Sequence, residues 1–400
     1  MTHITFESTQ EGRYERHRLI SWWDQERLAN ARAVVAGAGA LGNEVLKLLA
    51  LLGFGHVLIV DFDTVSVSNL SRTVLFRDAD VGRPKAAVAA ERIRQINPQI
   101  DARAINGDLQ FDVGLGEFRD ADIVLGCLDS VNARWALNRK CMMAGALWID
   151  AGMSDYHGHV TKYSPDAGPC YECTFTEATW DRFSRRYSCP YGLLNALPEV
   201  AMPSTAVTTS AIAALQVQEA LLVLHGIRDC GLRPGERLTL YLKPYRMFTD
   251  VVQRNNPDCG AHETVPRSIP VVDLAYYDLT ASGVIEIAED LFHQELVLKL
   301  GFDLVDSLYC PQCDDREQVV LPKGKVHQHQ LSCPRCHQPR EPDFVNAIGR
   351  EMHLASLQLR RLGIPPNDIL AFTSPSSTVG AKSFLHVRDR GYCSTGVSSD

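Results

Sequence analysis

The stretch that decides the fold is residues 31–85, ARAVVAGAGALGNEVLKLLALLGFGHVLIVDFDTVSVSNLSRTVLFRDADVGRPK. An apolar, β-branched run at 33–36 leads into the glycine turn GAGALG at 37–42, and the next apolar residues recur at helical spacing up to residue 52. A second apolar run, 57–60, ends on Asp61. This order of strand, glycine turn, helix, strand and acid places phosphates at the helix N-terminus and ribose hydroxyls at the carboxylate. It predicts a nucleotide site.

Three glycines and one acid are the candidate binding residues of this turn: Gly37, Gly39, Gly42 and Asp61. Asp63 is an alternative ribose acid, although the end of the strand favours Asp61. A lone GxGxxG motif is weak evidence, but here a predicted strand and helix flank it and an acid follows about 20 residues on. A glycine turn used only for close packing would leave the acid unexplained.

Composition narrows the class of protein. The chain has 400 residues, 45% of them hydrophobic, and a net charge of −8, which suggests two or three globular domains without general attraction to nucleic acid or anionic membrane. The N-terminus, MTHITFESTQEGRYERHR, is polar and lacks the apolar core of a signal peptide. Gln216, Gln218 and Glu219 interrupt the longest apolar stretch. We therefore expect a soluble, cytoplasmic protein without a membrane span.

Strands alternate with helices up to about residue 151, which predicts an α/β fold with a doubly wound, mostly parallel sheet. A polar, partly helical lead-in precedes it at 1–30, and a nucleotide-binding domain is expected over 31–265. Its later part contains a hairpin region at 152–173, an irregular segment at 174–203, a long helix at 205–224 and two antiparallel strands within 238–253. A linker at 257–270 then leads to a second domain, 270–400, with a helix-rich opening, a cysteine-rich centre and a Ser/Thr/Gly-rich tail.

Twelve cysteines are present, and six of them form three CxxC pairs. The pairs are Cys170/Cys173, Cys310/Cys313 and Cys333/Cys336. In a large α/β chain such pairs are typical of a reduced, metal-binding cytosolic protein. The last two pairs lie 19 residues apart and predict a four-thiolate zinc ribbon at 310–336. Acidic and basic side chains are mixed there, which favours a structural or protein-binding role over nucleic-acid binding.

The ordered motifs GAGALG, DFDTVSVSNLSR, VGRPK, CLDS and PCYEC resemble the ThiF/MoeB family of adenylating enzymes, whose domain also occurs in ubiquitin-activating (E1-like) enzymes. The resemblance covers about 13–262 and implies a Rossmann-like domain. Members use MgATP to adenylate the C-terminal glycine carboxylate of a ubiquitin-like or sulfur-carrier protein. That attack crowds negative charge at the α-phosphorus, so cations must offset it. The chain has no Walker lysine motif to supply them.

The resemblance assigns roles to particular residues. Arg72 and Lys85 match the family's phosphate-contacting cations, and Asn69 matches its SNL asparagine. Asp129, in CLDS, matches the aspartate that organises Mg²⁺. Arg16 matches an arginine that reaches the triphosphate from the neighbouring subunit, with Arg13 as the alternative, and so implies a homodimer.

The resemblance also implies a zinc site and a nucleophile. Cys170 and Cys173 would pair with a second CxxC, but here that segment reads CxxH, so the implied ligands are Cys170, Cys173, Cys259 and His262. Members that go beyond adenylation hold a cysteine in the crossover segment, 174–203, where Cys189 is the only one. Among the remaining cysteines, Cys393 in the tail is the runner-up nucleophile, and Cys127 and Cys141 fit buried packing positions.

The leading interpretation is thus an E1-like activating enzyme that captures its carrier as a thioester on Cys189, with a conjugating enzyme as a further partner. One alternative is a sulfur-carrier adenylyltransferase of thiamine or molybdopterin synthesis, and another is adenylation without a thiol step. Two alternatives come from other classes: an NAD-dependent oxidoreductase, prompted by the glycine turn, and a non-enzymatic zinc scaffold or nucleic-acid binder, prompted by the ribbon.

Overall fold

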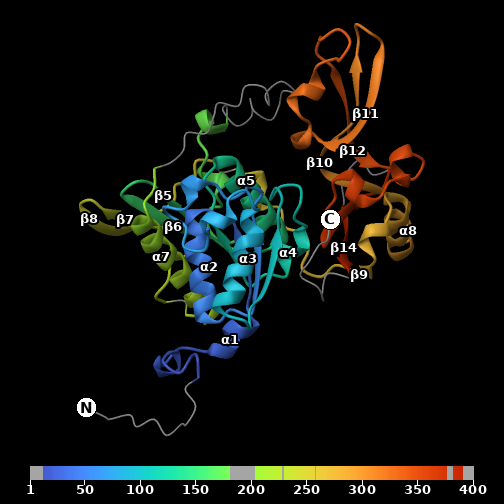
Figure 1. Ribbon diagram of the computed structural model, residues 1–400. Coiled ribbons are helices and arrows are strands. Elements are labelled where there is room, and N and C mark those ends of the chain that lie inside the picture. The colour runs from blue at the N-terminus through green and yellow to red at the C-terminus, as the bar shows by residue number, and fades with distance from the viewer. Residues whose placement is uncertain (1–11, 181–202, 228, 257, 376–381, 391–400) are drawn as a thin grey trace, which may run out of the picture.

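The computed structural model describes residues 12–180, 203–227, 229–256, 258–375 and 382–390 (Figure 1). It contains an α/β domain and a second domain from which a narrow β-ribbon projects. The predicted α/β, doubly wound fold is confirmed.

An eight-stranded sheet with the order β3-β2-β1-β4-β5-β6-β7-β8 organises the first domain. The strands from β1 to β5 are parallel, and β6, β7 and β8 extend the sheet in antiparallel fashion. The strand order reverses between β1 and β4, and at such a switch point ligands bind beyond the carboxyl ends of the strands. The strands are β1 (Arg32–Ala36), β2 (His56–Val60), β3 (Asp101–Ile105), β4 (Ile123–Gly126), β5 (Trp148–Met153), β6 (His157–Tyr163), β7 (Glu236–Leu242) and β8 (Tyr245–Val251).

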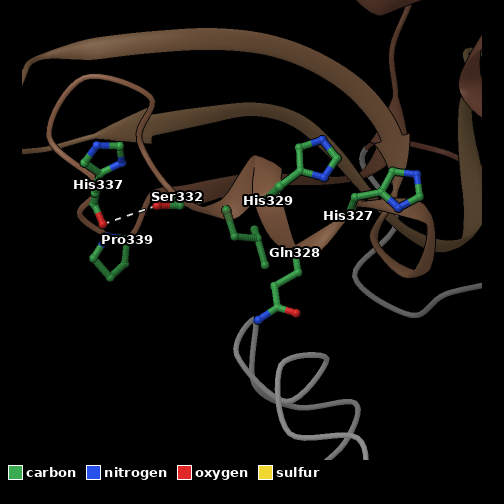
Figure 2. A pocket seen from close by; sticks show the side chains of 7 residues that line it. His327, Gln328, His329, Ser332, His337 and Pro339 are labelled. Carbon is green, nitrogen blue, oxygen red and sulfur yellow. Dashed lines mark hydrogen bonds between the residues drawn. The ribbon is translucent and has the colours of Figure 1, made fainter.

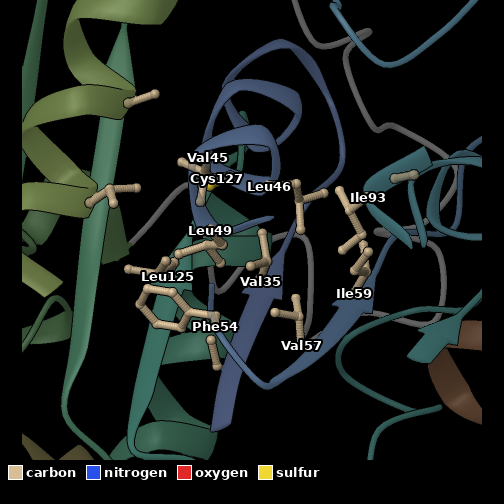
Figure 3. Close-up of a cluster of buried hydrophobic side chains, with 14 of the residues drawn as sticks. Val35, Val45, Leu46, Leu49, Phe54, Val57, Ile59, Ile93, Leu125 and Cys127 are labelled. Atoms are coloured by element: carbon tan, nitrogen blue, oxygen red, sulfur yellow. The ribbon is translucent and has the colours of Figure 1, made fainter. Parts of the chain in front are cut away.

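Helices cover both faces of this sheet. On one face α2, α3 and α7 enclose a core in which Val35, Leu49 and Ile59 are fully buried (Figure 3). On the other face α4 and α5 cover Val124 and Trp148. The helices are α1 (Gln25–Asn30), α2 (Ala40–Leu52), α3 (Lys85–Ile96), α4 (Leu115–Arg119), α5 (Val131–Ala144) and α7 (Ala206–Leu224).

Helix α7 is long and apolar enough to cross a membrane by length and composition alone. In the structure it packs against α2 and β5 instead. Its buried Gln216 donates through Nε2 to the carbonyl oxygens of Gly126 (3.0 Å) and Ile149 (2.8 Å), so this polar side chain ties the helix to the sheet. The packing therefore explains the apolar composition as that of a core helix.

The second domain contains one α-helix, which lies in its opening part, and six strands within the described part of residues 270–400. The strand order is β11-β10-β13-β14-β9, with β12 also paired to β10. Strand β10 is long enough to serve two structures: its first residues pair with β13, and its remainder carries the ribbon with β11 and β12. The elements are β9 (Val271–Leu274), α8 (Ala281–Phe292), β10 (Val297–Cys310), β11 (Asp315–Pro322), β12 (Glu341–Ile348), β13 (Asp368–Thr373) and β14 (Ser383–Asp389).

The second domain docks on α4 of the first. The backbone N–H of Gly116 donates to the Asn367 carbonyl (2.9 Å), and that of Leu115 donates to an Asp368 carboxylate oxygen (2.7 Å). A Cβ on Gly116 would lie 2.2 Å from His386 Nε2, so the contact requires glycine. The segment expected to be a linker also packs, because Val265 is buried against the first domain.

Candidate functional site: a nucleotide cradle and two cysteine clusters

The three glycines of the turn after β1 have different roles: Gly37 and Gly42 allow the turn to close, and Gly39 leaves space at the helix N-terminus. Gly37 has φ +97°, and a Cβ there would lie 2.4 Å from the Cys127 carbonyl oxygen. A Cβ on Gly42 would lie 2.0 Å from the Gly37 carbonyl oxygen, so the turn closes only if both residues lack one. Gly39 is the N-cap of α2 and has no heavy atom within 4 Å of its Cβ position. The open space at Gly39 therefore faces a helix N-terminus, where a phosphate binds favourably.

Asp61 lies beside this turn at the end of β2. Its carboxylate accepts hydrogen bonds from the backbone N–H groups of Ala38 (2.7 Å) and Asp63 (2.8 Å). Burial raises the pKa of Asp61, and the two backbone donors with the Lys85 ammonium oppose that rise. A carboxylate that stays beside the glycine turn is suited to accept hydrogen bonds from the ribose hydroxyl groups. The alternative acid, Asp63, is used differently, since it pairs with Lys85.

Lys85 is the cation nearest to these acids. It is the first residue of α3, is largely buried, and places Nζ 2.7 Å from Asp63 Oδ2. A lysine at a helix N-terminus opposes the helix dipole and so carries an electrostatic cost. Binding an anion there would offset that cost. The arrangement fits the predicted phosphate contact.

The SNLSR segment forms a short capped turn between β2 and α3. The Asn69 Oδ1 accepts from the Ser66 backbone N–H (2.9 Å), which fixes the turn. The guanidinium of the half-buried Arg72 donates to the Ser68 carbonyl (2.9 Å). Asn69 thus has a structural role here, and Arg72 is held on the surface by a single backbone contact.

Asp129 follows β4 at the same edge of the sheet and is exposed. Two residues later α5 begins, and the Ser130 Oγ caps it by accepting from the Ala133 N–H (3.1 Å). The carboxylates of Asp61 and Asp129 thus follow strands on either side of β1. Oxygen ligands of this kind suit Mg²⁺ bound to nucleotide phosphates.

Sequence reasoning missed a buried group beside Asp129. Arg134 Nε lies 3.0 Å from Asp150 Oδ1, and His159 Nε2 lies 3.6 Å from Asp150 Oδ2. Burial by itself would raise the pKa of Asp150, but the nearby Arg134 and His159 outweigh burial and lower it. These residues come from α5, β5 and β6, and no spacing in the sequence connects them.

Arg16 lies at the opposite end of the domain. The neighbouring Tyr14 packs against Gly53 at the C-terminus of α2, and Arg13 donates to the Ile96 carbonyl at the end of α3. Thirteen residues of α2 separate this region from the glycine turn, about 20 Å at 1.5 Å per residue. One chain therefore does not bring Arg16 to its own nucleotide cradle.

The first metal cluster gathers four predicted ligands within 4.8 Å of one another: Cys170, Cys173, Cys259 and His262. The Cys170 sulfur lies 3.7 Å from that of Cys173 and 3.8 Å from that of Cys259, and His262 Nε2 lies 3.1 Å from Cys173. Ligands 2.3 Å from a tetrahedral zinc ion stand about 3.8 Å apart, whereas a disulfide is about 2 Å long. The donor set and spacing fit zinc.

The second cluster lies at the end of the ribbon that is far from β13, where β10 turns into β11, and gathers Cys310, Cys313, Cys333 and Cys336. Cys310 ends β10, and its sulfur lies 3.6 Å from that of Cys336. The backbone N–H of Cys336 lowers the pKa of Cys333 to about 6, whereas the hydrogen bond with the Cys336 thiol raises the pKa of Cys313 to about 12. An open hollow lined by His327, His329 and His337 lies on the ribbon (Figure 2), beside this cluster, because the lining residues Ser332 and His337 adjoin Cys333 and Cys336 in sequence.

The remaining cysteines separate by burial. Cys127 and Cys141 are buried, and burial raises the pKa of both thiols, as expected for packing residues. Cys230 is exposed. The candidate nucleophile Cys189 and its runner-up Cys393 both lie outside the described residues.

Comparison with known proteins agrees with the fold and the motifs. The ThiF family model matches residues 14–261. A SAMP-activating enzyme E1 of Haloferax volcanii is 32% identical over 259 residues, which are 64% of this chain and 90% of that protein. A sulfur carrier protein adenylyltransferase of Thermus thermophilus is 32% identical over 260 residues, which are 62% of this chain and 88% of that protein.

Among solved structures, E. coli MccB in complex with succinimide aligns with a TM-score of 0.52 at 25% identity, over 64% of this chain and 75% of MccB. The family match leaves the second domain, with its ribbon, outside. The predicted adenylating enzyme is confirmed at the level of the family. The chain belongs to the ThiF family.

Proposed function

We propose that this enzyme adenylates the C-terminal glycine carboxylate of a ubiquitin-like or sulfur-carrier protein. In this reaction a carboxylate oxygen of the carrier attacks the α-phosphorus of ATP, the bond to the β-phosphate oxygen breaks, and pyrophosphate leaves. The product is the carrier's acyl-adenylate. The similarity to activating enzymes and carrier adenylyltransferases supports this proposal.

One observation carries the proposal: the open face of Gly39 lies on the same edge of the sheet as Asp61, Lys85 and Asp129. A hydride-transferring enzyme needs the glycine turn and the ribose acid but has no use for a further cation and carboxylate here. Adenylation needs both, because negative charge builds up at the phosphates. Magnesium, held through Asp129, would supply further positive charge to the leaving pyrophosphate.

Lys85 and Arg72 have different roles in offsetting the negative charge of the phosphates. Lys85 is held in place by Asp63, so it presents a fixed ammonium at the N-terminus of α3. Arg72 is half-buried, and its guanidinium donates to one backbone carbonyl in an exposed hydrogen bond, so it is available to a phosphate. Asn69 keeps the turn between them in shape. The glycine turn and Asp61 bind and orient the nucleotide.

In the second step of the proposed reaction, Cys189 acts as the nucleophile. Its thiolate would attack the acyl carbon, form a thioester and release AMP. Cys189 is the only cysteine of the crossover segment 174–203, and three arginines precede it closely: Arg182, Arg185 and Arg186. Nearby cations favour the thiolate form. A conjugating enzyme would be the next acceptor of the acyl group.

Incubation with MgATP and candidate carriers tests this step, with the products separated on nonreducing gels. The wild type should form a carrier adduct that dithiothreitol and hydroxylamine remove, and Cys189→Ala should not. The matched control is Cys230→Ala, because this exposed cysteine lies outside both clusters and the crossover segment. An adduct that persists in Cys189→Ala would exclude this nucleophile. Adenylate formation without any adduct would favour the sulfur-carrier alternative, which the Thermus relative supports.

We also propose that the enzyme works as a homodimer in which Arg16 reaches the partner's cradle. Mixing two inactive variants, Arg16→Ala and Asp129→Asn, tests this arrangement. In a mixed dimer one cradle has its own Asp129 and receives Arg16 from the other chain, so activity should return. Failure of the mixture to recover activity, with subunit exchange verified, would refute action in trans. Free cysteine ligands suit a reducing compartment, so the proposed location is the cytoplasm.

A further inference from the structure

Three charged or titratable side chains form a group where β5 lies beside the first half of the antiparallel strand β6, and the chemistry above does not use them. The Asp150 carboxylate, whose side chain is 2% exposed, contacts Arg134 at 3.0 Å and His159 at 3.6 Å. Arg134 is itself mostly buried, with its side chain 14% exposed. Removing an ion pair from water is costly unless the geometry is good and other hydrogen bonds add to it. The pair therefore calls for a reason beyond stability.

The further contacts of Arg134 supply that reason. Its Nη2 atom donates to the Leu128 carbonyl at 2.5 Å and to the Ala151 carbonyl at 3.2 Å. One guanidinium thus joins the loop after β4 to the end of β5. The residue that follows Leu128 is Asp129, the proposed magnesium-organising acid.

The loop that carries Asp129 is anchored on both sides. Before it, the Cys127 N–H donates to the Ala36 carbonyl (2.8 Å), and Arg134 holds the Leu128 carbonyl. After it, Ser130 caps α5. Of these three contacts, only the one at the Leu128 carbonyl is made by a charged side chain, that of Arg134. It alone therefore depends on a distant partner, Asp150.

Close packing leaves Arg134 little freedom. A Cβ on Gly152 would lie 2.6 Å from His159 Cε1 and 3.1 Å from Arg134 Nη2. The guanidinium also has a planar fork that matches several acceptors at once, which a lysine ammonium does not. These features fix one orientation of the side chain, and with it the Leu128–Asp129 peptide.

We propose that Arg134, held by Asp150, is a positioning residue that aims the Asp129 carboxylate at the magnesium ion of the bound nucleotide. The inference rests on the proposed function for the identity of the nucleotide. Arg134 itself need not touch ATP or the carrier. Residues that orient a metal ligand from behind typically change metal affinity 10- to 100-fold when removed.

The main test variant is the double substitution Arg134→Gln with Asp150→Asn. It removes both charges together, so no unpaired charge stays buried, and the amides keep hydrogen-bonding capacity. Arg134→Lys is the conservative second variant. The matched control is Arg103→Gln with Glu117→Gln, because that pair (2.6 Å, Glu117 buried) lies in the same domain away from the loop.

The readout is the affinity for α,β-methylene-ATP with Mg²⁺ and with EDTA, which requires no carrier and no turnover. The ratio of the two affinities should fall about tenfold in the double variant. The ratio should fall less in Arg134→Lys and should stay at the wild-type value in the control pair. In Asp129→Asn, Mg²⁺ should no longer increase the affinity. A wild-type ratio in the double variant, or a wild type without Mg²⁺ dependence, would overturn the positioning role.

Pyrophosphate exchange measured on the same proteins separates this inference from the proposed function. A reduced Mg²⁺ ratio without any carrier-dependent exchange in the wild type would keep the positioning role and reject adenylation. Normal exchange in the wild type, together with an unchanged Mg²⁺ ratio in the double variant, would support adenylation and reject the positioning role. Thermal unfolding of each variant distinguishes a lost fold from a displaced loop, because a purely structural role lowers Tm and leaves the Mg²⁺ ratio as it is.

Discussion

Two alanine substitutions in the glycine turn should separate folding from nucleotide binding. In Gly42→Ala the new Cβ would lie 2.0 Å from the Gly37 carbonyl oxygen, a backbone atom that cannot rotate away. Overpacking of this kind costs about 1–3 kcal/mol. At about 2–4 °C per kcal/mol for a domain of this size, Tm should fall by about 2–12 °C.

In Gly39→Ala the new Cβ has no heavy atom within 4 Å, and the φ of −70° is allowed for alanine. Loss of a glycine N-cap costs about 1 kcal/mol or less, and the smaller entropy of the unfolded chain returns about 0.4–1 kcal/mol. Without nucleotide, Tm should therefore change by no more than about 3 °C. The methyl group would, however, occupy the space through which a phosphate approaches the helix.

Thermal unfolding with and without Mg²⁺ and α,β-methylene-ATP measures both effects. A ligand at 100 times its Kd stabilises by about 2.7 kcal/mol, which raises the wild-type Tm by about 5–11 °C. Gly39→Ala should lose this rise and keep its basal Tm. A full ligand-induced rise in Gly39→Ala would refute the assignment of the cradle, and an unchanged basal Tm in Gly42→Ala would refute the packing argument.

Three further predictions concern the metal clusters and the contact between domains. Elemental analysis should find two zinc ions per chain, falling to one in His262→Ala and staying at two in His262→Cys; an unchanged count in His262→Ala would contradict the first cluster. Burial lowers the pKa of His386, so the folded chain binds fewer protons there than the unfolded one, and stability should drop as pH falls below about 6.5, by at most about 1.4 kcal/mol per pH unit. Comparing Tm at pH 7 and pH 5.5 should show a smaller loss in His386→Gln than in the wild type; equal losses would reject His386 as the source. Gly116→Ala should push His386 and the Asn367 carbonyl away and make the second domain more sensitive to proteolysis, whereas wild-type resistance would show that the contact adapts.

The sequence was sufficient where the signal is local. The strand, glycine turn and helix of residues 33–52 follow from a short pattern whose physical causes lie within it: a positive φ at Gly37 and a close approach at Gly42. The ribbon cluster was accessible from the spacing of its two CxxC pairs, whereas Cys259 and His262 were assigned to the first cluster only through the resemblance to the ThiF family. Even the CxxH departure at His262 kept a chemically suitable ligand.

The sequence was insufficient where partners come from distant elements. Arg134, Asp150 and His159 lie on three different elements: the pairing of β5 with β6 brings Asp150 and His159 together, and the packing of α5 on the sheet adds Arg134. The pairing of Asp63 with Lys85 depends in the same way on how α3 returns to the sheet. In the second domain, β10 serves two structures with an irregular register, and this blurs the period-two pattern that identifies a strand.

The most direct test of the account is carrier-dependent exchange of labelled pyrophosphate into ATP. With Mg²⁺ and a carrier that ends in an intact glycine, label should enter ATP, and it should not enter with a carrier that lacks this glycine. Charge reversal by Asp129→Lys should abolish the exchange. Absence of exchange with the true carrier, or undiminished exchange in Asp129→Lys, would contradict the claim that this edge of the sheet directs a carboxylate onto the α-phosphorus.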